Sequence, residues 1–180
     1  ITMIPPYILI SQPFKNYRGM MDTGARRIKR SIFIDQTSVR FAQPKDIQAW
    51  KKVTVLQPYL VQKEQEIMIK NSEMPSSKDH IINARNITNI GTFRTYIQRY
   101  LEHHPKIEQN LTLLVRQLQP TSEGIPIEIY AFSNDPRWIE YEQIQSDIFD
   151  HLLASITHFD LRLFQSPTGF DFREHRKGLF

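Results

Sequence analysis

The chain has 180 residues, of which 40% are hydrophobic and 11% aromatic, and this is enough apolar material for one compact domain. It contains no cysteine, which excludes disulfides, thiolate zinc sites and cysteine nucleophiles. Lysine and arginine exceed aspartate and glutamate by 23 to 19, and a net charge of +4 does not by itself indicate a nucleic-acid-binding protein.

The chain opens on an apolar, strand-like segment, ITMIPPYILI, with no initiator methionine at position 1. No apolar run approaches the roughly 20 residues of a membrane-spanning helix, and the first residues lack the pattern of a signal peptide. We therefore expect a piece of a longer protein. A strand is expected at 7–11, followed by a polar connector rich in turn-forming residues that ends near Gly24.

The next segment, RRIKRSIFID, predicts a strand with one solvated face, because apolar and polar residues alternate along it. Its inward positions are Ile28, Ile32 and Ile34. It also holds the densest basic cluster of the chain, which comprises Arg26, Arg27, Lys29 and Arg30. Such a cluster could contact phosphates, but the solvated face of a strand explains it more simply.

The middle of the chain predicts helices. Pro44 suits a first helical position, and helical spacing then runs for about seven turns with an interruption at Pro58, which indicates one bent helix or two. Residues 74–88 are mixed in polarity and predict a long loop or insertion. A further helix is expected over 91–104, ending before Pro105.

The last third predicts a hairpin, a helix and a final strand. Strands at 111–119 and 125–132 flank the turn TSEG. The following helix is expected to be capped by Asn134 or Asp135. Its apolar stripe comprises Trp138, Tyr141, Ile144, Ile148, Leu152 and Ile156. A strand at 160–165 closes the order.

From Arg26 the expected order is strand, helix, inserted helix, strand, strand, helix, strand. Without the insertion this is the α+β, ferredoxin-like βαββαβ arrangement, with two helices on one face of a four-stranded antiparallel sheet. The fold class does not by itself define a function.

The stretch MMDTGA resembles the active-site turn of an aspartic protease, with Asp22 in the catalytic position. Such proteases need two of these loops sharing a proton, and each loop belongs to an all-β barrel. This sequence has no second Asp-Thr-Gly, and a basic strand and a long helix follow the first. We interpret 22–24 as a turn and predict no catalytic role for Asp22.

Two histidines, His151 and His158, lie seven residues apart on or near the last helix, and Asp147 lies one turn before His151. A helical metal site uses such spacing, but no third ligand lies close in sequence, and surface histidines explain the pattern better. No glycine-rich phosphate loop is present. We therefore predict no catalytic, cofactor-binding or metal-binding residues, and no enzymatic activity.

Several stretches together resemble the C-terminal cytoplasmic region of the small-conductance mechanosensitive (MscS-type) ion channel family, in its larger, miniconductance branch linked to osmotic stress. The resemblance covers most of 2–171. Its main stretches are TMIPPYILISQPFKNYRGM, GARRIKRSIFID, RNITNIGTFRTYIQRYLEHHP, the run over 111–154 and FQSPTGFD. The run over 111–154 is the most specific of them.

The resemblance implies three regions: the end of an upper β domain and a connector (1–24), a lower αβ cage domain (25–171) and a C-terminal tail (172–180). It places Asp22 in the connector. It further implies a homo-heptameric cage on the cytoplasmic side of the inner membrane, below a tension-gated pore that passes ions and small osmolytes. The pore helices would precede this chain, and neither a cofactor nor a nucleic-acid partner is expected. The alternative is a free-standing ferredoxin-like regulatory or nucleic-acid-binding module.

Overall fold

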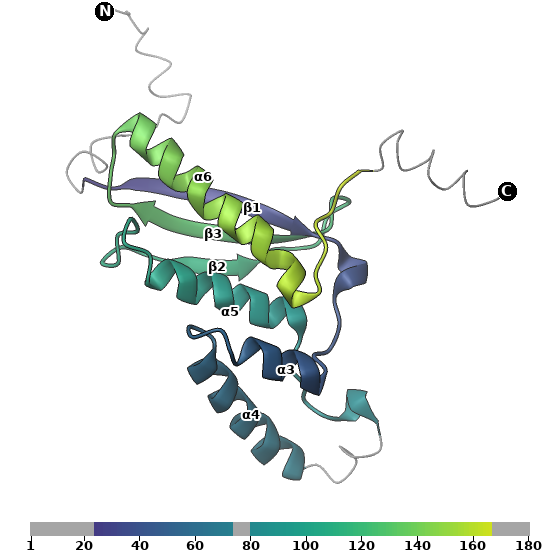
Figure 1. Ribbon diagram of the computed structural model, residues 1–180. Helices are drawn as coiled ribbons and strands as arrows, with labels where there is room; N and C mark the ends of the chain where they lie inside the picture. Colours follow the sequence, from purple (N-terminus) through teal and green to yellow (C-terminus); the bar gives the residue numbers. More distant parts are fainter. Residues whose placement is uncertain (1–23, 74–79, 167–180) are drawn as a thin grey trace, which may run out of the picture.

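The computed structural model describes residues 24–73 and 80–166, and these form a three-stranded antiparallel sheet with helices packed on one face (Figure 1). The strands are β1 (Arg26–Ile34), β2 (Leu114–Gln117) and β3 (Ile125–Ser133). Their order is β1-β3-β2, so β3 is the central strand. The expected strand at 7–11 and the connector that contains Asp22 lie outside the described residues.

The alternation of side chains along β1 and β3 decides which face of the sheet is buried. β1 pairs with β3 so that Ile28 lies opposite Ala131 and Ile32 opposite Ile127. All four side chains are buried, at 3% exposure or less, because they face the helices. The period-two pattern of the sequence therefore correctly predicted the core side of this strand pair.

Two helices cover that apolar face, namely α5 (Asn89–Glu102) and α6 (Trp138–Ser155) (Figure 1). Thr88 is the N-cap of α5, and its hydroxyl accepts a hydrogen bond from the Gly91 N–H at 3.2 Å. Its side chains at 93, 97 and 101 are fully buried. The helix predicted over 91–104 is confirmed, with bounds two residues earlier in the sequence.

The start of α6 differs from the prediction. Arg137 occupies the N-cap, without a side-chain cap, in place of Asn134 or Asp135. Trp138 is 71% exposed and not part of the apolar stripe, because in the first turn its indole points to solvent, 3.3 Å from Glu142 Oε1. The rest of the predicted stripe is buried, and its last member, Ile156, begins the 3₁₀ helix η4 (Ile156–Phe159).

The helical insertion consists of two helices, α3 (Pro44–Trp50) and α4 (Gln57–Ser72), which project away from the sheet (Figure 1). Pro58 lies in the first turn of α4, so the helical stretch is split in two and not bent. The prediction took the helix at 91–104 as the inserted one. This is wrong, because α5 carries a complete apolar face onto the sheet, whereas Leu60 is the only buried residue of α4.

The predicted fourth strand is reduced to one bridge, between Ile34 and Leu163. Two backbone hydrogen bonds support it, from the Asp35 N–H to the Arg162 carbonyl (2.8 Å) and from the Phe164 N–H to the Phe33 carbonyl (2.9 Å). This segment meets β1 only where that strand ends, so a longer ladder does not form among the described residues. The position beside β1 is the one that the ferredoxin-like order requires, and the α+β class is confirmed.

Arg40 ties the insertion to the body of the domain. Its guanidinium lies 2.7 Å from Asp46 Oδ2 in the first turn of α3 and 2.7 Å from Asp160 Oδ2 after η4. The hydrogen bond from Arg40 is the main cause that lowers the pKa of Asp46 below its usual 3.8. The ionised form of Asp46 is therefore favoured in the folded state.

We expect the Asp46→Asn variant to lose less stability on acidification than the wild type. Because the folded pKa of Asp46 is depressed, its contribution is fully present above 3.8 and is lost as the pH falls through the folded value. Urea denaturation between about pH 5 and about pH 2.5 measures this difference. Other carboxylates titrate alike in both proteins, so parallel pH profiles would contradict the role given to this pair.

Candidate functional site

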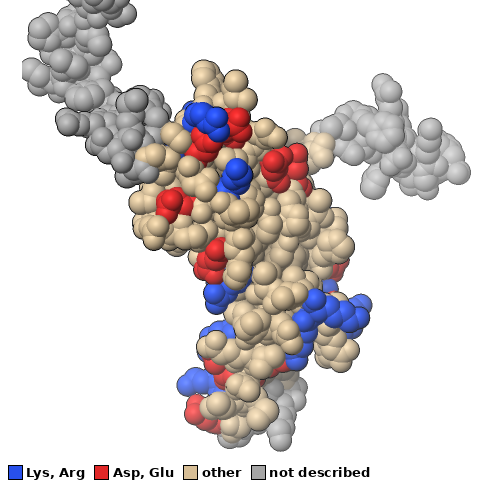
Figure 2. All heavy atoms as spheres, turned by 60° about the vertical axis from the view of Figure 1, so that its left-hand side comes forward, with Lys and Arg blue, Asp and Glu red and all other residues tan. Residues whose placement is uncertain are grey.

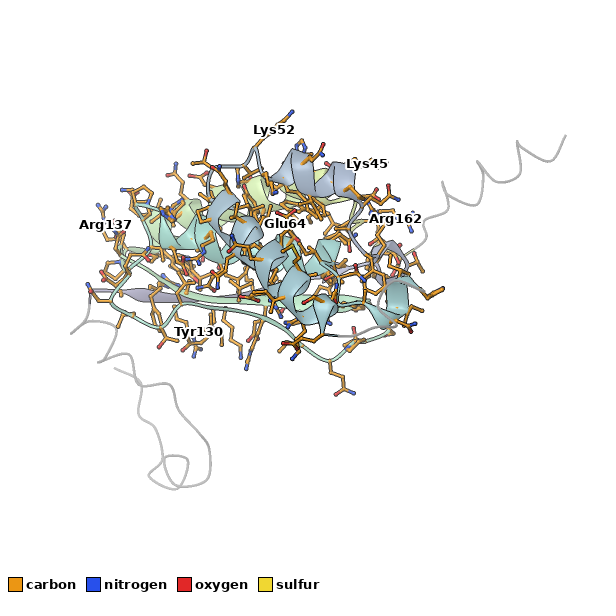
Figure 3. The ribbon with its side chains drawn as sticks, turned by 90° about the horizontal axis from the view of Figure 1, so that it is seen from below. Lys45, Lys52, Glu64, Tyr130, Arg137 and Arg162 are labelled. Atoms are coloured by element: carbon orange, nitrogen blue, oxygen red, sulfur yellow. The ribbon has the colours of Figure 1, made fainter. Side chains whose placement is uncertain are left out.

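The sheet has one face that no described helix covers. Seen from below, all the helices lie on one side of the sheet, and Tyr130 points away from them (Figure 3). We call this surface the open face. The outward positions of the three strands form it, namely Arg27, Lys29, Ser31, Phe33, Leu114, Arg116, Pro126, Glu128, Tyr130 and Phe132.

Glu128 lies at the centre of the open face and is only 6% exposed. Arg116 Nη2 approaches Glu128 Oε1 at 2.7 Å and Arg116 Nε donates to the same oxygen at 2.8 Å. On the other side, Lys29 Nζ lies 3.6 Å from Oε2. One carboxylate is thus shared by cations from both neighbouring strands, so this cross-strand pairing neutralises part of the positive charge of the face.

The predicted basic cluster is divided between the two sides of β1. Arg26 and Arg30 lie on the helix side, with their guanidinium carbons 4.1 Å and 4.2 Å from the ring centres of Tyr141 and Phe149 in α6. Arg27 lies on the open face, 5.8 Å from the ring centre of Tyr130. These cation–π contacts cover the edge of the core. The cluster therefore does not form a single phosphate-binding surface.

The surface charge is mixed elsewhere too. On the face shown in Figure 2, lysine and arginine side chains lie among aspartate and glutamate side chains at both ends of the molecule. This distribution does not resemble the continuous basic stripe that long nucleic-acid contacts require.

A polar aromatic cluster joins α5 to α6. Tyr96 Oη lies 2.6 Å from His151 Nε2, and the Tyr100 ring stacks on the His151 ring with centroids 4.4 Å apart. His104 packs edge-on against Tyr100 at 5.5 Å. Burial raises the pKa of Tyr100, and burial lowers the pKa of His104 although Asp147 opposes this effect. These contacts hold α5 and α6 together.

His151 and His158 do not come together as a metal site. His151 is taken up by the tyrosines, whereas the carbonyl of His158 accepts a hydrogen bond from the Trp50 indole at 2.9 Å. Within 24–73 and 80–166, no three His, Asp or Glu side chains are grouped closely enough to hold a metal ion. Asp22 lies outside the described residues, so its predicted lack of a catalytic role stays a prediction.

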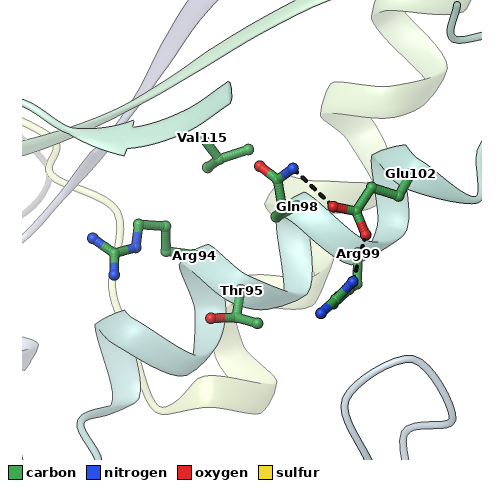
Figure 4. A pocket seen from close by; sticks show the side chains of 6 residues that line it. All are labelled: Arg94, Thr95, Gln98, Arg99, Glu102 and Val115. Atoms are coloured by element: carbon green, nitrogen blue, oxygen red, sulfur yellow. Dashed lines mark hydrogen bonds and ion pairs between the residues drawn. The ribbon is translucent and has the colours of Figure 1, made fainter. Parts of the chain in front are cut away.

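Along the free edge of β2, a groove of about 290 Å³ separates this strand from α5 (Figure 4). Its lining residues are Arg94, Thr95, Gln98, Arg99, Glu102 and Val115. Sequence reasoning missed this groove, since its members come from a helix and a strand whose contact depends on the fold. The exposed positions of a helix next to a short edge strand were the available signal.

Among the helices of the described residues, none combines the length and the apolar character needed to cross a bilayer. Residues 84–161 match the family model described as mechanosensitive ion channel MscS, C-terminal. The matched region comprises α5, β2, β3, α6 and η4. The description is that of an ion channel domain. Residues 84–161 therefore form a domain of the MscS-type channel C-terminal kind.

Proposed function

We propose that this chain is part of the cytoplasmic cage of a tension-gated channel that releases ions and small osmolytes on hypo-osmotic shock. The observation that carries the proposal is the family match over 84–161, which spans the helices and strands that form the body of the domain. Membrane tension would act on helices encoded before this chain. The described domain would contribute assembly and a charged wall that filters what reaches the pore.

The surface of the domain suits assembly into a ring. Large apolar side chains are exposed at the start of α6, where Trp138 is 71% and Ile139 is 81% exposed, and Leu114 on β2 is 42% exposed. A subunit surface that is buried only in an oligomer has this composition. We propose a homo-heptamer, placed on the cytoplasmic side of the inner membrane and belonging to the miniconductance branch.

The proposed role needs no catalytic group, cofactor or metal, and it involves no nucleic acid. The pairing of Arg116 and Lys29 with Glu128 supports the last point, because it occupies cations that phosphates would otherwise engage. The regions assigned by resemblance, 1–24, 25–171 and 172–180, are part of this proposal.

Patch-clamp recording under graded suction tests the proposal. The full-length gene is expressed in bacterial membranes that lack other mechanosensitive channels, and we expect tension-activated currents that are absent from the empty-vector control. Survival of the same cells after hypo-osmotic shock gives a second readout. Silent patches, with the protein detected in the membrane, would contradict the conducting role and favour the free-standing regulatory module.

A further inference from the structure

The outer edge of β2 offers unpaired backbone groups. β2 is the last strand in the order β1-β3-β2, and no other strand of the described residues pairs with its outer side. The Leu118 N–H donates to the Pro126 carbonyl at 2.9 Å. Since hydrogen-bonding direction alternates along an antiparallel pair, Arg116 and Leu114 also bond toward β3, and Val115 and Gln117 direct their N–H and C=O groups outward.

The groove between β2 and α5 lies beside these outward groups. Val115 from β2 and Gln98 from α5 face one another across it, with Arg94 next to them (Figure 4). An extended segment that paired with Val115 and Gln117 would direct alternate side chains toward the helix side of the sheet. Those side chains would enter the groove of about 290 Å³. Backbone pairing and side-chain pockets are the two components of strand-addition binding.

The charges in the groove indicate which side chains it would accept. Arg94 has no ion-pair or hydrogen-bond partner within the described residues. Arg99 is already paired, because its Nη1 lies 2.8 Å from a carboxylate oxygen of Glu102, whose other oxygen accepts from the Gln98 amide at 2.9 Å. One cation therefore remains available, and a carboxylate is the group that would complement it.

The same charges disfavour a second copy of this chain at the edge. If two β2 edges paired about a two-fold axis, Arg94 and Arg99 of each copy would approach those of the other. Pairing β2 with the free edge of β1 in another copy brings arginines together again, since β1 carries Arg26 and Arg30. Like charges placed opposite one another are destabilising.

We infer that the β2 edge binds an extended acidic polypeptide segment of a partner, which adds as a strand and places carboxylates over Arg94. This inference goes beyond the channel role, because neither tension nor conduction enters it.

Fluorescence anisotropy of the full 180-residue chain with a labelled peptide of alternating glutamate and valine tests the inference. We expect saturable binding, and none by a peptide in which lysine replaces glutamate. The Arg94→Glu variant should bind about tenfold more weakly because it reverses the charge that meets the carboxylate. Lys52→Glu, an equal reversal in the turn between α3 and α4, should leave binding unchanged within about twofold.

Backbone pairing is tested at Gln117. The Gln117→Pro variant removes the outward N–H, which an edge strand tolerates, and should also weaken binding about tenfold. The Gln117→Ala variant keeps the N–H and should retain affinity. Should the proline variant fail to fold, amide shift mapping on the wild type decides, and we expect the largest shifts at Val115 and Gln117.

Three results would overturn the inference: no saturable binding, equal binding of both peptides, or amide shifts confined to other surfaces. Analytical ultracentrifugation of the chain without peptide tests whether two copies pair through their β2 edges. A dimer that Gln117→Pro abolishes would assign the edge to a second copy and contradict the acidic partner. These readouts do not depend on channel activity. The inference can therefore fail while the channel proposal stands, and the channel proposal can fail while the inference stands.

Discussion

Replacing Phe93 by alanine is expected to lower the free energy of unfolding by about 3 to 5 kcal/mol, the usual cost of removing a fully buried aromatic ring. Phe93 is 0% exposed, and its ring lies 5.2 Å from that of Phe159 in η4. The Phe159 ring in turn stacks on Trp50 of α3, with ring centres 5.6 Å apart, and packs in a tilted arrangement against Tyr96 at 5.3 Å. The cavity would therefore weaken the junction of α5, η4 and α3 together.

Equilibrium urea denaturation measures this loss, and Phe41→Ala is the matched control. Phe41 is 39% exposed, so the same truncation there should cost less than about 1 kcal/mol. Equal costs at the two positions would show that the aromatic junction is not part of the stabilising core.

Asn89→Ala is expected to have the second largest effect, a loss of about 2 to 4 kcal/mol, because several backbone groups would lose their partners at once. Asn89 is 0% exposed at the first position of α5. Its Oδ1 accepts from the Arg40 N–H at 3.0 Å and from the Ile90 N–H at 2.9 Å. Its Nδ2 donates to the carbonyls of Ser38 at 2.8 Å and Asp160 at 3.3 Å.

Thermal and urea denaturation of two further variants separate these contributions. Asn89→Asp keeps the acceptor but loses the donor toward the Ser38 and Asp160 carbonyls, and we expect it to be unstable as well, because a carboxylate would face those oxygens in a buried place. Thr88→Ala removes only the helix cap and should cost about 1 kcal/mol. A loss at Asn89 no larger than at Thr88 would contradict the role of the amide in joining three segments.

Asn89 also illustrates what sequence reasoning misses. In the sequence it is one polar residue near the start of a helix, inside the motif RNITNIG. Its partners at 38, 40 and 160 are 49 to 71 residues away and become neighbours only when η4 and the segment after β1 meet. Local pattern carries no information on such distant pairs, so no reading of the sequence alone could have assigned this role.

The groove beside β2 is of the same kind. Arg94 and Gln98 belong to the exposed side of a predicted helix, and Val115 belongs to a predicted strand. The helix and the strand border one groove because β2 is the terminal strand of the sheet. β2 is terminal because β3 occupies the centre. The free carboxylate-binding capacity of Arg94 likewise depends on which neighbours the fold supplies.

The sequence by itself determined the α+β class, the alternating core face of β1 and β3, and the apolar stripes of α5 and α6, because hydrophobic periodicity is a local property of the chain. It also carried the resemblance to the MscS family, through the stretch that the family model matches over 84–161. The tertiary structure alone decided that α3 and α4 are the insertion and that the last strand shrinks to one bridge. These outcomes depend on contacts between distant segments, whose free energies no local pattern encodes.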